Sequence, residues 1–147
     1  KEDNMEYLRN EMKMEFLAVS SNEGFARVAV GAFVAELNPT VDELADIKTA
    51  VSEAVTNCII HGYEQKEGSI WISCRIEGHQ VEISVMDTGK GIKDIEQARE
   101  PLFTTKPELE RSGMGFAFME AFMDEVEVVS EPFKGTSVIM RKTIGEG

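Results

Sequence analysis

The chain has 147 residues, of which 42% are hydrophobic and 29% are charged, which fits one globular domain with a sizeable core. Its formal net charge of −12 excludes non-specific binding of nucleic acid, because that binding requires a basic face. No apolar run is long enough to span a bilayer and no secretory signal pattern opens the chain, so we expect a cytoplasmic protein. Cys58 and Cys74 lie in separate apolar segments, which predicts two buried thiols in a reducing compartment.

The first part of the chain predicts a strand followed by a helix. Residues 1–10 are polar and are interpreted as an N-terminal tail, and residues 11–147 as a single domain. Weak alternation over residues 11–19 predicts a strand, and Ser20 with Glu23 has the spacing of a capping box. Asn38 and Pro39 end the helix. Helical spacing predicts that its buried face consists of Phe25, Val28, Ala29, Ala32, Phe33 and Leu37.

A second helix and a hairpin follow. Thr40 and Glu43 form another capping box, and the helix extends to about His61 before Gly62. Its expected buried stripe is Leu44, Ile47, Val51, Ala54, Val55 and Cys58. Alternating apolar residues over 70–76 and 81–85 predict two strands, joined by a tight turn at residues 78–79.

The last part of the chain begins with a long irregular segment. Residues 87–112 show no periodicity beyond one short helical turn at 94–99, and a loop this long in a compact domain is usually functional. A helix over 113–123 and two strands over 125–130 and 136–142 complete the order β-α-α-β-β-loop-α-β-β. This order predicts an α+β two-layer sandwich, with a mixed, mostly antiparallel sheet and helices on one face.

Three short motifs carry candidate chemistry, and the first lies on the second helix. Glu53, Asn57 and His61 are spaced four apart and share one helix face. An Asn oxygen is a suitable Mg²⁺ ligand, and a Glu one turn earlier can accept a proton. A solvated row of polar residues is the alternative, and this helix alone favours it. His61 is more simply a helix-end residue that interacts with the terminal carbonyls.

The second motif follows the second strand of the hairpin. Asp87 at a strand end can accept a hydrogen bond from an exocyclic amine such as that of adenine. Gly89 and Gly91 permit positive φ and a close approach of a ring to the backbone. An ordinary Asp-x-Gly turn is the alternative and would be preferred if the motif stood alone.

The third motif opens the helix after the long loop. Gly113 and Gly115 leave free N–H groups at the helix start, where the helix dipole favours a phosphate. Lys106 and Arg111 in the preceding loop could reach a phosphate, although an exposed charged loop is the simpler interpretation. The glycine pair does not match the GxxxxGK[ST] phosphate loop.

Together, the motifs carry a resemblance to a known fold. Their order, Glu-x3-Asn-x3-His, Asp-x-Gly-x-Gly and Gly-x-Gly, resembles the Bergerat-type ATP-binding fold of gyrase B, Hsp90, histidine kinases and MutL, over residues 11–142. Within that superfamily, residues 52–57, 60–63 and 101–115 are similar to the anti-sigma serine kinases, in particular the anti-sigma F factors of endospore-forming bacteria.

The resemblance implies a role for each matching residue. Asn57 would bind Mg²⁺ and Glu53 would activate the attacking serine hydroxyl. Asp87 would hold the adenine amine, close to Gly89 and Gly91 and supported by Thr136. Arg27 would face a partner. The remaining residues would form a lid over the phosphates of ATP or ADP and a cradle beneath them: Thr104, Thr105, Arg111, Ser112, Gly113, Met114 and Gly115.

The resemblance also implies an activity. A homodimer would bind the sporulation sigma factor F and keep it from RNA polymerase, without contacting nucleic acid or membrane. It would use Mg-ATP to phosphorylate a serine of an anti-anti-sigma factor. Two alternatives stay open: an isolated histidine-kinase-like or clamp-ATPase catalytic domain, and a non-catalytic module in which ATP only shapes a partner surface.

Overall fold

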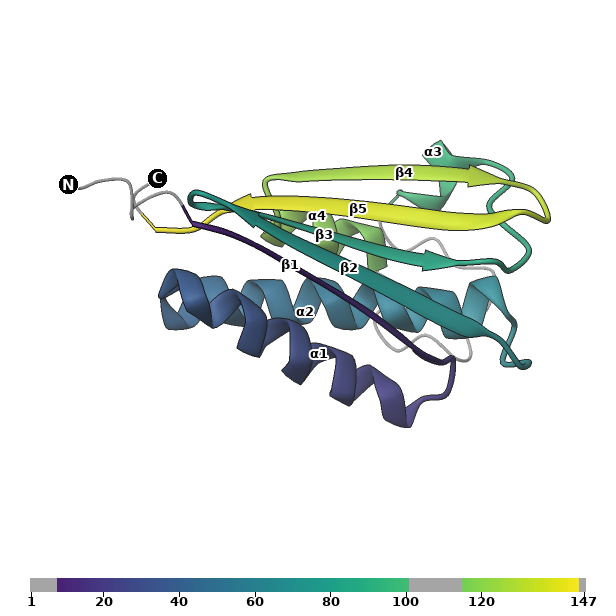
Figure 1. The fold of residues 1–147 in the computed structure, drawn as a ribbon. Coiled ribbons are helices and arrows are strands. Elements are labelled where there is room, and N and C mark those ends of the chain that lie inside the picture. The colour runs from purple at the N-terminus through teal and green to yellow at the C-terminus, as the bar shows by residue number, and fades with distance from the viewer. Residues whose placement is uncertain (1–7, 101–114, 146–147) are drawn as a thin grey trace.

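The computed structural model describes residues 8–100 and 115–145, and its framework is a five-stranded sheet (Figure 1). The strand order is β1-β2-β3-β5-β4, and all four pairings are antiparallel. The α+β sandwich predicted from the sequence is confirmed, although no parallel pair occurs in the described part of the sheet, which was expected to be mixed. The strands are β1 (Arg9–Leu17), β2 (Ser69–Glu77), β3 (Gln80–Asp87), β4 (Glu125–Glu131) and β5 (Gly135–Thr143).

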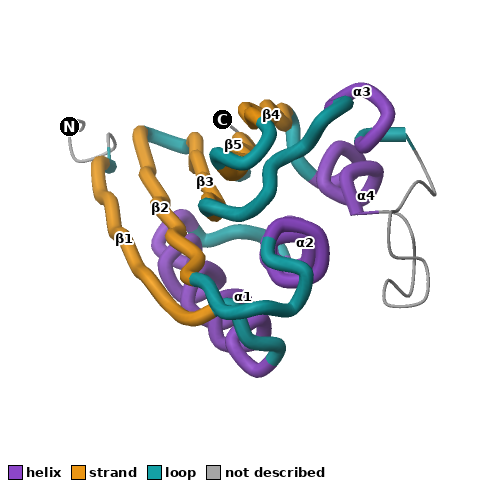
Figure 2. Tube along the Cα trace, turned by 90° about the vertical axis from the view of Figure 1, so that its right-hand side faces the viewer, coloured by secondary structure: helices purple, strands orange, loops and turns teal. Residues whose placement is uncertain are grey.

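The main helices lie on one face of this sheet, as expected (Figures 1 and 2). The central helix α2 contacts α1 on one side and α4 on the other. None of the helices over residues 8–100 and 115–145 is long and apolar enough to cross a membrane. The helical elements are α1 (Ser21–Val34), η2 (Ala35–Leu37), α2 (Val41–Asn57), η3 (Cys58–Gly62), α3 (Ile95–Ala98) and α4 (Gly115–Phe122).

Helix α2 forms as its sequence predicts. The Thr40 side chain accepts a hydrogen bond from the Glu43 N–H at 3.0 Å, and Glu43 accepts one from the Thr40 N–H at 2.9 Å. This capping box satisfies two N–H groups that a helix start leaves without partners. After Asn57 the helix widens into the single π-turn η3, which the Tyr63 N–H closes on the Cys58 oxygen at 2.9 Å. Four of the six residues predicted for the stripe are buried in α2 and Cys58 is buried in η3, whereas Leu44 is half-buried. The buried residues of α2 are Ile47, Ala50, Val51, Ala54 and Val55.

Helix α1 differs from its prediction in both its cap and its buried face. Ser20 is helical and its side chain makes no capping bond, whereas Glu23 pairs with Arg27. The predicted apolar face is wrong over the first turns of α1, because Phe25 and Val28 are 55% and 62% exposed, whereas Leu37 at the end of η2 is buried as predicted. A neighbouring stripe of smaller residues packs inward instead and lets α1 approach α2 closely: Ala26, Val30, Gly31 and Val34.

The core lies between the sheet and the helices. The inner face of the β2–β3 hairpin alternates as predicted, with Ile70, Ile72, Cys74 and Ile76 facing Val81, Ile83 and Val85. The hairpin turn places Gly78 at φ 62°. Cys58 and Cys74 are both buried free thiols, as predicted. The sheet register sets Asp87, the last residue of β3, opposite Thr136 on β5, and so brings two predicted site residues together.

Candidate functional site

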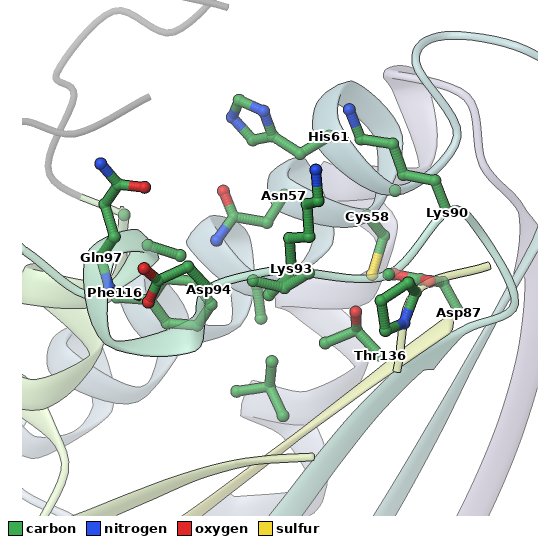
Figure 3. Close-up of a pocket in the computed structure, with 18 of the residues that line it drawn as sticks. Asn57, Cys58, His61, Asp87, Lys90, Lys93, Asp94, Gln97, Phe116 and Thr136 are labelled. Carbon is green, nitrogen blue, oxygen red and sulfur yellow. Dashed lines mark hydrogen bonds between the residues drawn. The ribbon is translucent and has the colours of Figure 1, made fainter. Parts of the chain in front are cut away.

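A cavity of about 510 Å³ opens between the end of α2, the ends of β3 and β5, and the segment that follows β3 (Figure 3). Its volume and mostly apolar walls are typical of a small-molecule site. The structure brings six of the residues singled out in the sequence to its lining: Asn57, His61, Asp87, Gly91, Gly115 and Thr136.

Asp87 forms the deep end of this cavity. It is the buried charged residue of the described chain, with 7% of its surface exposed. The Gly89 N–H donates to its Oδ1 at 2.9 Å. Burial raises the pKa of the Asp87 carboxyl, and hydrogen bonds from Gly89, Cys58 and Thr136 oppose that rise. These hydrogen bonds fix the orientation of the carboxylate, which faces the cavity as a hydrogen-bond acceptor. Such an acceptor suits recognition of an amine.

The two glycines after Asp87 are required by packing of the backbone itself. A Cβ at Gly89 would lie 2.2 Å from the Gly62 oxygen, so only glycine lets this loop meet the end of α2. Gly91 has φ +77°, and a Cβ there would lie 2.1 Å from the Glu131 oxygen. Positive φ was predicted at both glycines and occurs at Gly91 alone, which also lines the cavity, whereas Gly89 does not. The two glycines join the cavity loop to η3 and to the end of β4.

Thr136 is held beside Asp87 by a short polar chain. Its hydroxyl lies 2.8 Å from Ser130 Oγ, which also accepts the Ile92 N–H at 2.8 Å. Tyr63 fixes the other side of the loop, because its hydroxyl accepts the Thr88 N–H at 2.8 Å. Hydrogen bonds therefore join β4, β5 and the loop after β3 at the deep end of the cavity.

Asn57 marks the opposite end. Its side chain projects from α2 into the cavity (Figure 3). A Cβ on Gly115, at the start of α4, would lie 3.2 Å from both amide heteroatoms of Asn57, so a glycine keeps the space beside this amide open. Glu53 lies one helical turn earlier, half-buried and outside the cavity lining. His61 lines the cavity one turn later, which its interpretation as a simple helix-end residue missed.

The loop after β3 supplies a charged wall that the sequence reasoning did not identify. The Lys90 ammonium lies 3.1 Å from the Glu64 carboxylate. Lys93 rises from the opposite wall toward the Asn57 side of the cavity (Figure 3). Asp94 caps α3 by accepting the Gln97 N–H at 3.0 Å, which confirms the expected helical turn. In the sequence, this predicted turn was the one indication of an ordered wall in the loop.

The other predicted site residues fall elsewhere. Arg27 does not line the cavity: its guanidinium contacts Glu23 at 2.6 Å and Ser52 Oγ at 3.1 Å, between α1 and α2. The predicted lid and most of the phosphate cradle lie outside the described residues: Thr104, Thr105, Lys106, Arg111, Ser112, Gly113 and Met114.

Comparisons with known proteins agree with this geometry. Residues 20–142 match the family model of the histidine kinase-like ATPase domain. The chain is 60% identical over 136 residues to the anti-sigma F factor of Halalkalibacterium halodurans, covering 92% of this chain and 93% of that protein. It is 62% identical over 141 residues to that of Thermoanaerobacter pseudethanolicus, covering 96% and 98%. The chain belongs to the anti-sigma F factor family.

Further matches support this assignment. The anti-sigma F factor of Bacillus subtilis is 57% identical over 140 residues, covering 95% of this chain and 96% of that protein. The crystal structure of the RsbU and RsbW domains of Rv1364c from Mycobacterium tuberculosis aligns with a TM-score of 0.67 at 22% identity. That alignment covers 92% of this chain and 32% of the other, and it shows a shared fold.

A histidine kinase-like ATPase domain implies binding of ATP or ADP, and the cavity is the candidate site for it. The geometry fits such a ligand. A buried carboxylate lies at the deep end, apolar Val85 and Val138 form the walls, and the start of α4 borders the Asn57 end. A helix start with free N–H groups is a favourable place for phosphate.

Proposed function

We propose that this anti-sigma F family member is an ATP-dependent protein serine kinase that also binds a sporulation sigma factor. In this proposal it holds sigma factor F away from RNA polymerase in the cytoplasm and phosphorylates a serine of an anti-anti-sigma factor. The observation that carries the proposal is one cavity with buried Asp87 at its deep end and Asn57 at its other end, in a chain 57–62% identical to anti-sigma F factors.

The deep end would bind adenine. The Asp87 carboxylate would accept a hydrogen bond from the exocyclic amine, and Thr136 and the Gly91 backbone would border the ring. Val85 and Val138 would cover its apolar faces. Because Asp87 is 7% exposed, loss of this hydrogen bond would leave a desolvated group without its partner, so the contact discriminates strongly for a base that donates here.

The opposite end would hold the phosphates. The Asn57 side-chain oxygen would be a protein ligand of Mg²⁺, which would neutralise charge that develops on the phosphates during transfer. Gly115 and the residues before it would cradle the phosphates, with Ser112, Gly113 and Met114 in the cradle and Thr104, Thr105 and Arg111 in the lid. The start of α4 beside Asn57 supports this orientation.

Glu53 is proposed as the base that accepts the proton of the attacking serine. It lies on α2 one turn before Asn57, outside the cavity lining. In this proposal the serine of the protein substrate reaches Glu53 from outside the cavity. Positioning and charge stabilisation dominate phosphoryl transfer, so a base here would add to a site that already orients both reactants.

Partner binding is proposed for the side of the molecule formed by α1 and β1. Strand β1 is an edge strand of the described sheet, and an edge strand can pair its backbone groups with another chain. Four large apolar residues are exposed along the end of β1 and the first turns of α1: Leu17, Val19, Phe25 and Val28. Arg27 lies in the same part of α1. Exposed apolar surface of this kind is typical of interfaces and supports the proposals of a homodimer and of an Arg27 contact with a partner.

The decisive experiment is co-purification with sigma factor F in Mg-ATP, followed by addition of the anti-anti-sigma factor. We expect release of sigma together with serine phosphorylation, measured with labelled ATP and phosphoamino-acid analysis. Phosphohistidine would favour a histidine-kinase-like domain instead. ATP-dependent sigma binding without any phosphoryl transfer would show a non-catalytic module.

Two substitutions separate binding from chemistry. Glu53→Gln should retain ADP binding and lose transfer, whereas Glu77→Gln on β2, distant from the cavity, should transfer normally. Asp87→Asn should weaken ADP binding at least about tenfold by calorimetry, because a hydrogen bond to a charged group is lost. Normal transfer by the Glu53 variant would refute its assignment as the base, and an unchanged dissociation constant for the Asp87 variant would refute the adenine contact.

A further inference from the structure

Cys58 lines the cavity, a position that its prediction as a buried thiol did not anticipate. It follows Asn57 directly and begins the π-turn η3. Its sulfur lies beside the Asp87 carboxylate (Figure 3). Cys74, the other buried thiol, lies on β2 and does not line the cavity. The two cysteines therefore share burial but not surroundings.

The chemistry of the Cys58–Asp87 pair favours a fixed hydrogen bond. Cys58 is 4% exposed, and its sulfur lies beside the Asp87 carboxylate (Figure 3). A protonated thiol donates, and the Asp87 carboxylate accepts. The bond lowers the pKa of Asp87 against the larger effect of burial, which raises it.

The other hydrogen bonds to the Asp87 carboxylate come from backbone groups. The Gly89 N–H occupies Oδ1, and Gly62 lies against Oδ2 without a side chain, since a Cβ there would be 2.8 Å away. Thr136 adds a backbone hydrogen bond from β5. Among the described residues, no charged neighbour contributes to the pKa shift of Asp87, although these titratable residues share its cavity: His61, Lys90, Lys93, Asp94 and Glu100.

We propose that Cys58 is a positioning residue for the nucleotide base: its S–H donates to the Asp87 carboxylate and, with the Gly89 N–H, fixes the rotamer that presents the remaining lone pairs to the exocyclic amine. This inference rests on the proposed role of the cavity as an adenine site. The thiol acts from behind the carboxylate and needs no contact with the base. A hydroxyl at this position would preserve the effect, whereas an alkyl group would not.

The test is ADP binding by calorimetry between pH 4.5 and pH 8, with folding monitored by circular dichroism. Cys58→Ala should weaken ADP binding about five- to tenfold at pH 7, as expected for one hydrogen bond to a carboxylate from a weak donor. Binding requires ionised Asp87, so affinity falls as the pH drops through the pKa of that carboxyl. Removing the donor raises this pKa, and the acid limb of the profile should therefore move to higher pH.

Matched variants separate positioning from packing. Cys58→Ser keeps a donor and should restore both the affinity and the position of the acid limb. Cys74→Ala removes a buried thiol away from the cavity and should leave both unchanged. If Cys58→Ala fails to fold, Cys58→Val fills the volume without a donor and should show the same weakened binding and shifted limb.

The outcomes distinguish this inference from the proposed function. If the wild-type protein binds ADP while a folded Cys58→Ala or Cys58→Val variant shows the same affinity and acid limb, the positioning role is overturned and the nucleotide site stands. If Cys58→Ser behaves like Cys58→Ala, the effect is packing and the role is likewise overturned. If the wild-type protein binds no ADP, the proposed function itself fails.

Discussion

Helices α1 and α2 lie side by side beneath one sheet, yet their surroundings differ. Helix α2 is flanked by α1 and α4, and its last turn enters the cavity. Helix α1 contacts α2 on one side and leaves Phe25 and Val28 exposed on the other. Helix α2 therefore combines core packing with the lining of the candidate nucleotide cavity, whereas α1 has apolar surface available for another molecule.

The largest expected effect lies in the interior of α2. Ile47 is fully buried, so Ile47→Ala should lower the free energy of unfolding by about 2–5 kcal/mol through lost burial and a residual cavity. Val28→Ala on α1 provides the control, because Val28 is 62% exposed and its replacement should cost less than about 0.5 kcal/mol. Urea denaturation measures both. Equal losses would contradict the comparison between the two helices.

The helix starts should differ by a smaller amount. Thr40→Ala removes the capping box of α2 and should cost about 1 kcal/mol of unfolding free energy. Ser20→Ala at the start of α1 should change stability by no more than about 0.5 kcal/mol, because the Ser20 side chain makes no capping bond. Denaturation midpoints of the two variants test this. A Ser20 variant as unstable as the Thr40 variant would show that Ser20 caps α1 in solution.

A pH dependence should follow from the same α2 cap. Glu43 accepts the Thr40 N–H and also the Gly145 N–H at 2.9 Å, and these bonds lower the pKa of its carboxyl. The stability that a lowered pKa contributes is complete above the ordinary Glu value of about 4.3 and is lost as the pH falls through the folded value. The melting temperature of Glu43→Gln should therefore depend less on pH than that of the wild-type protein between about pH 3 and pH 5. An acid limb identical to wild type would contradict this role.

The smallest effect on stability should accompany a change in association. Val28→Ser should alter the free energy of unfolding by about 0.5 kcal/mol or less, since the residue is exposed. It should nevertheless weaken dimer formation or sigma factor binding, as measured by sedimentation at several concentrations. Val129→Ser on edge strand β4 is a matched control, because Val129 is 54% exposed far from α1 in the sheet order. If both variants form dimers and bind the sigma factor as strongly as the wild-type protein does, α1 is not the interface.

The same two helices show what the sequence can predict. For α2, a local cap and a single apolar stripe point to one arrangement, so its start and buried face followed directly. For α1, apolar residues occupy two neighbouring faces, and periodicity cannot choose between them. The choice came from tertiary packing, because small residues such as Ala26 and Gly31 allow close contact with α2.

The site shows a similar division. The motifs pointed to Asn57 and Asp87, and the family resemblance added Thr136; all three lie at helix or strand ends that the fold brings to one cavity. The wall from Ile92 to Ala98 has no periodic signal, and its position depends on hydrogen bonds such as that from the Ile92 N–H to Ser130. Cys58 could have been found, since it immediately follows Asn57 on a helix whose buried face points toward β3.

The number of residues in the π-turn η3 determines how the end of this helix meets the loop that lines the cavity. It spans Cys58–Gly62, and the residues at its end make two contacts with the loop after β3: the Gly62 oxygen accepts the Lys90 N–H at 2.9 Å, and the Tyr63 hydroxyl accepts the Thr88 N–H at 2.8 Å. Deleting one residue here would remove the residue that the wide turn accommodates and would shorten the path from α2 to Gly62 and Tyr63. Both contacts would then be lost together, so homologues that share this cavity should tolerate substitutions in η3 more readily than insertions or deletions.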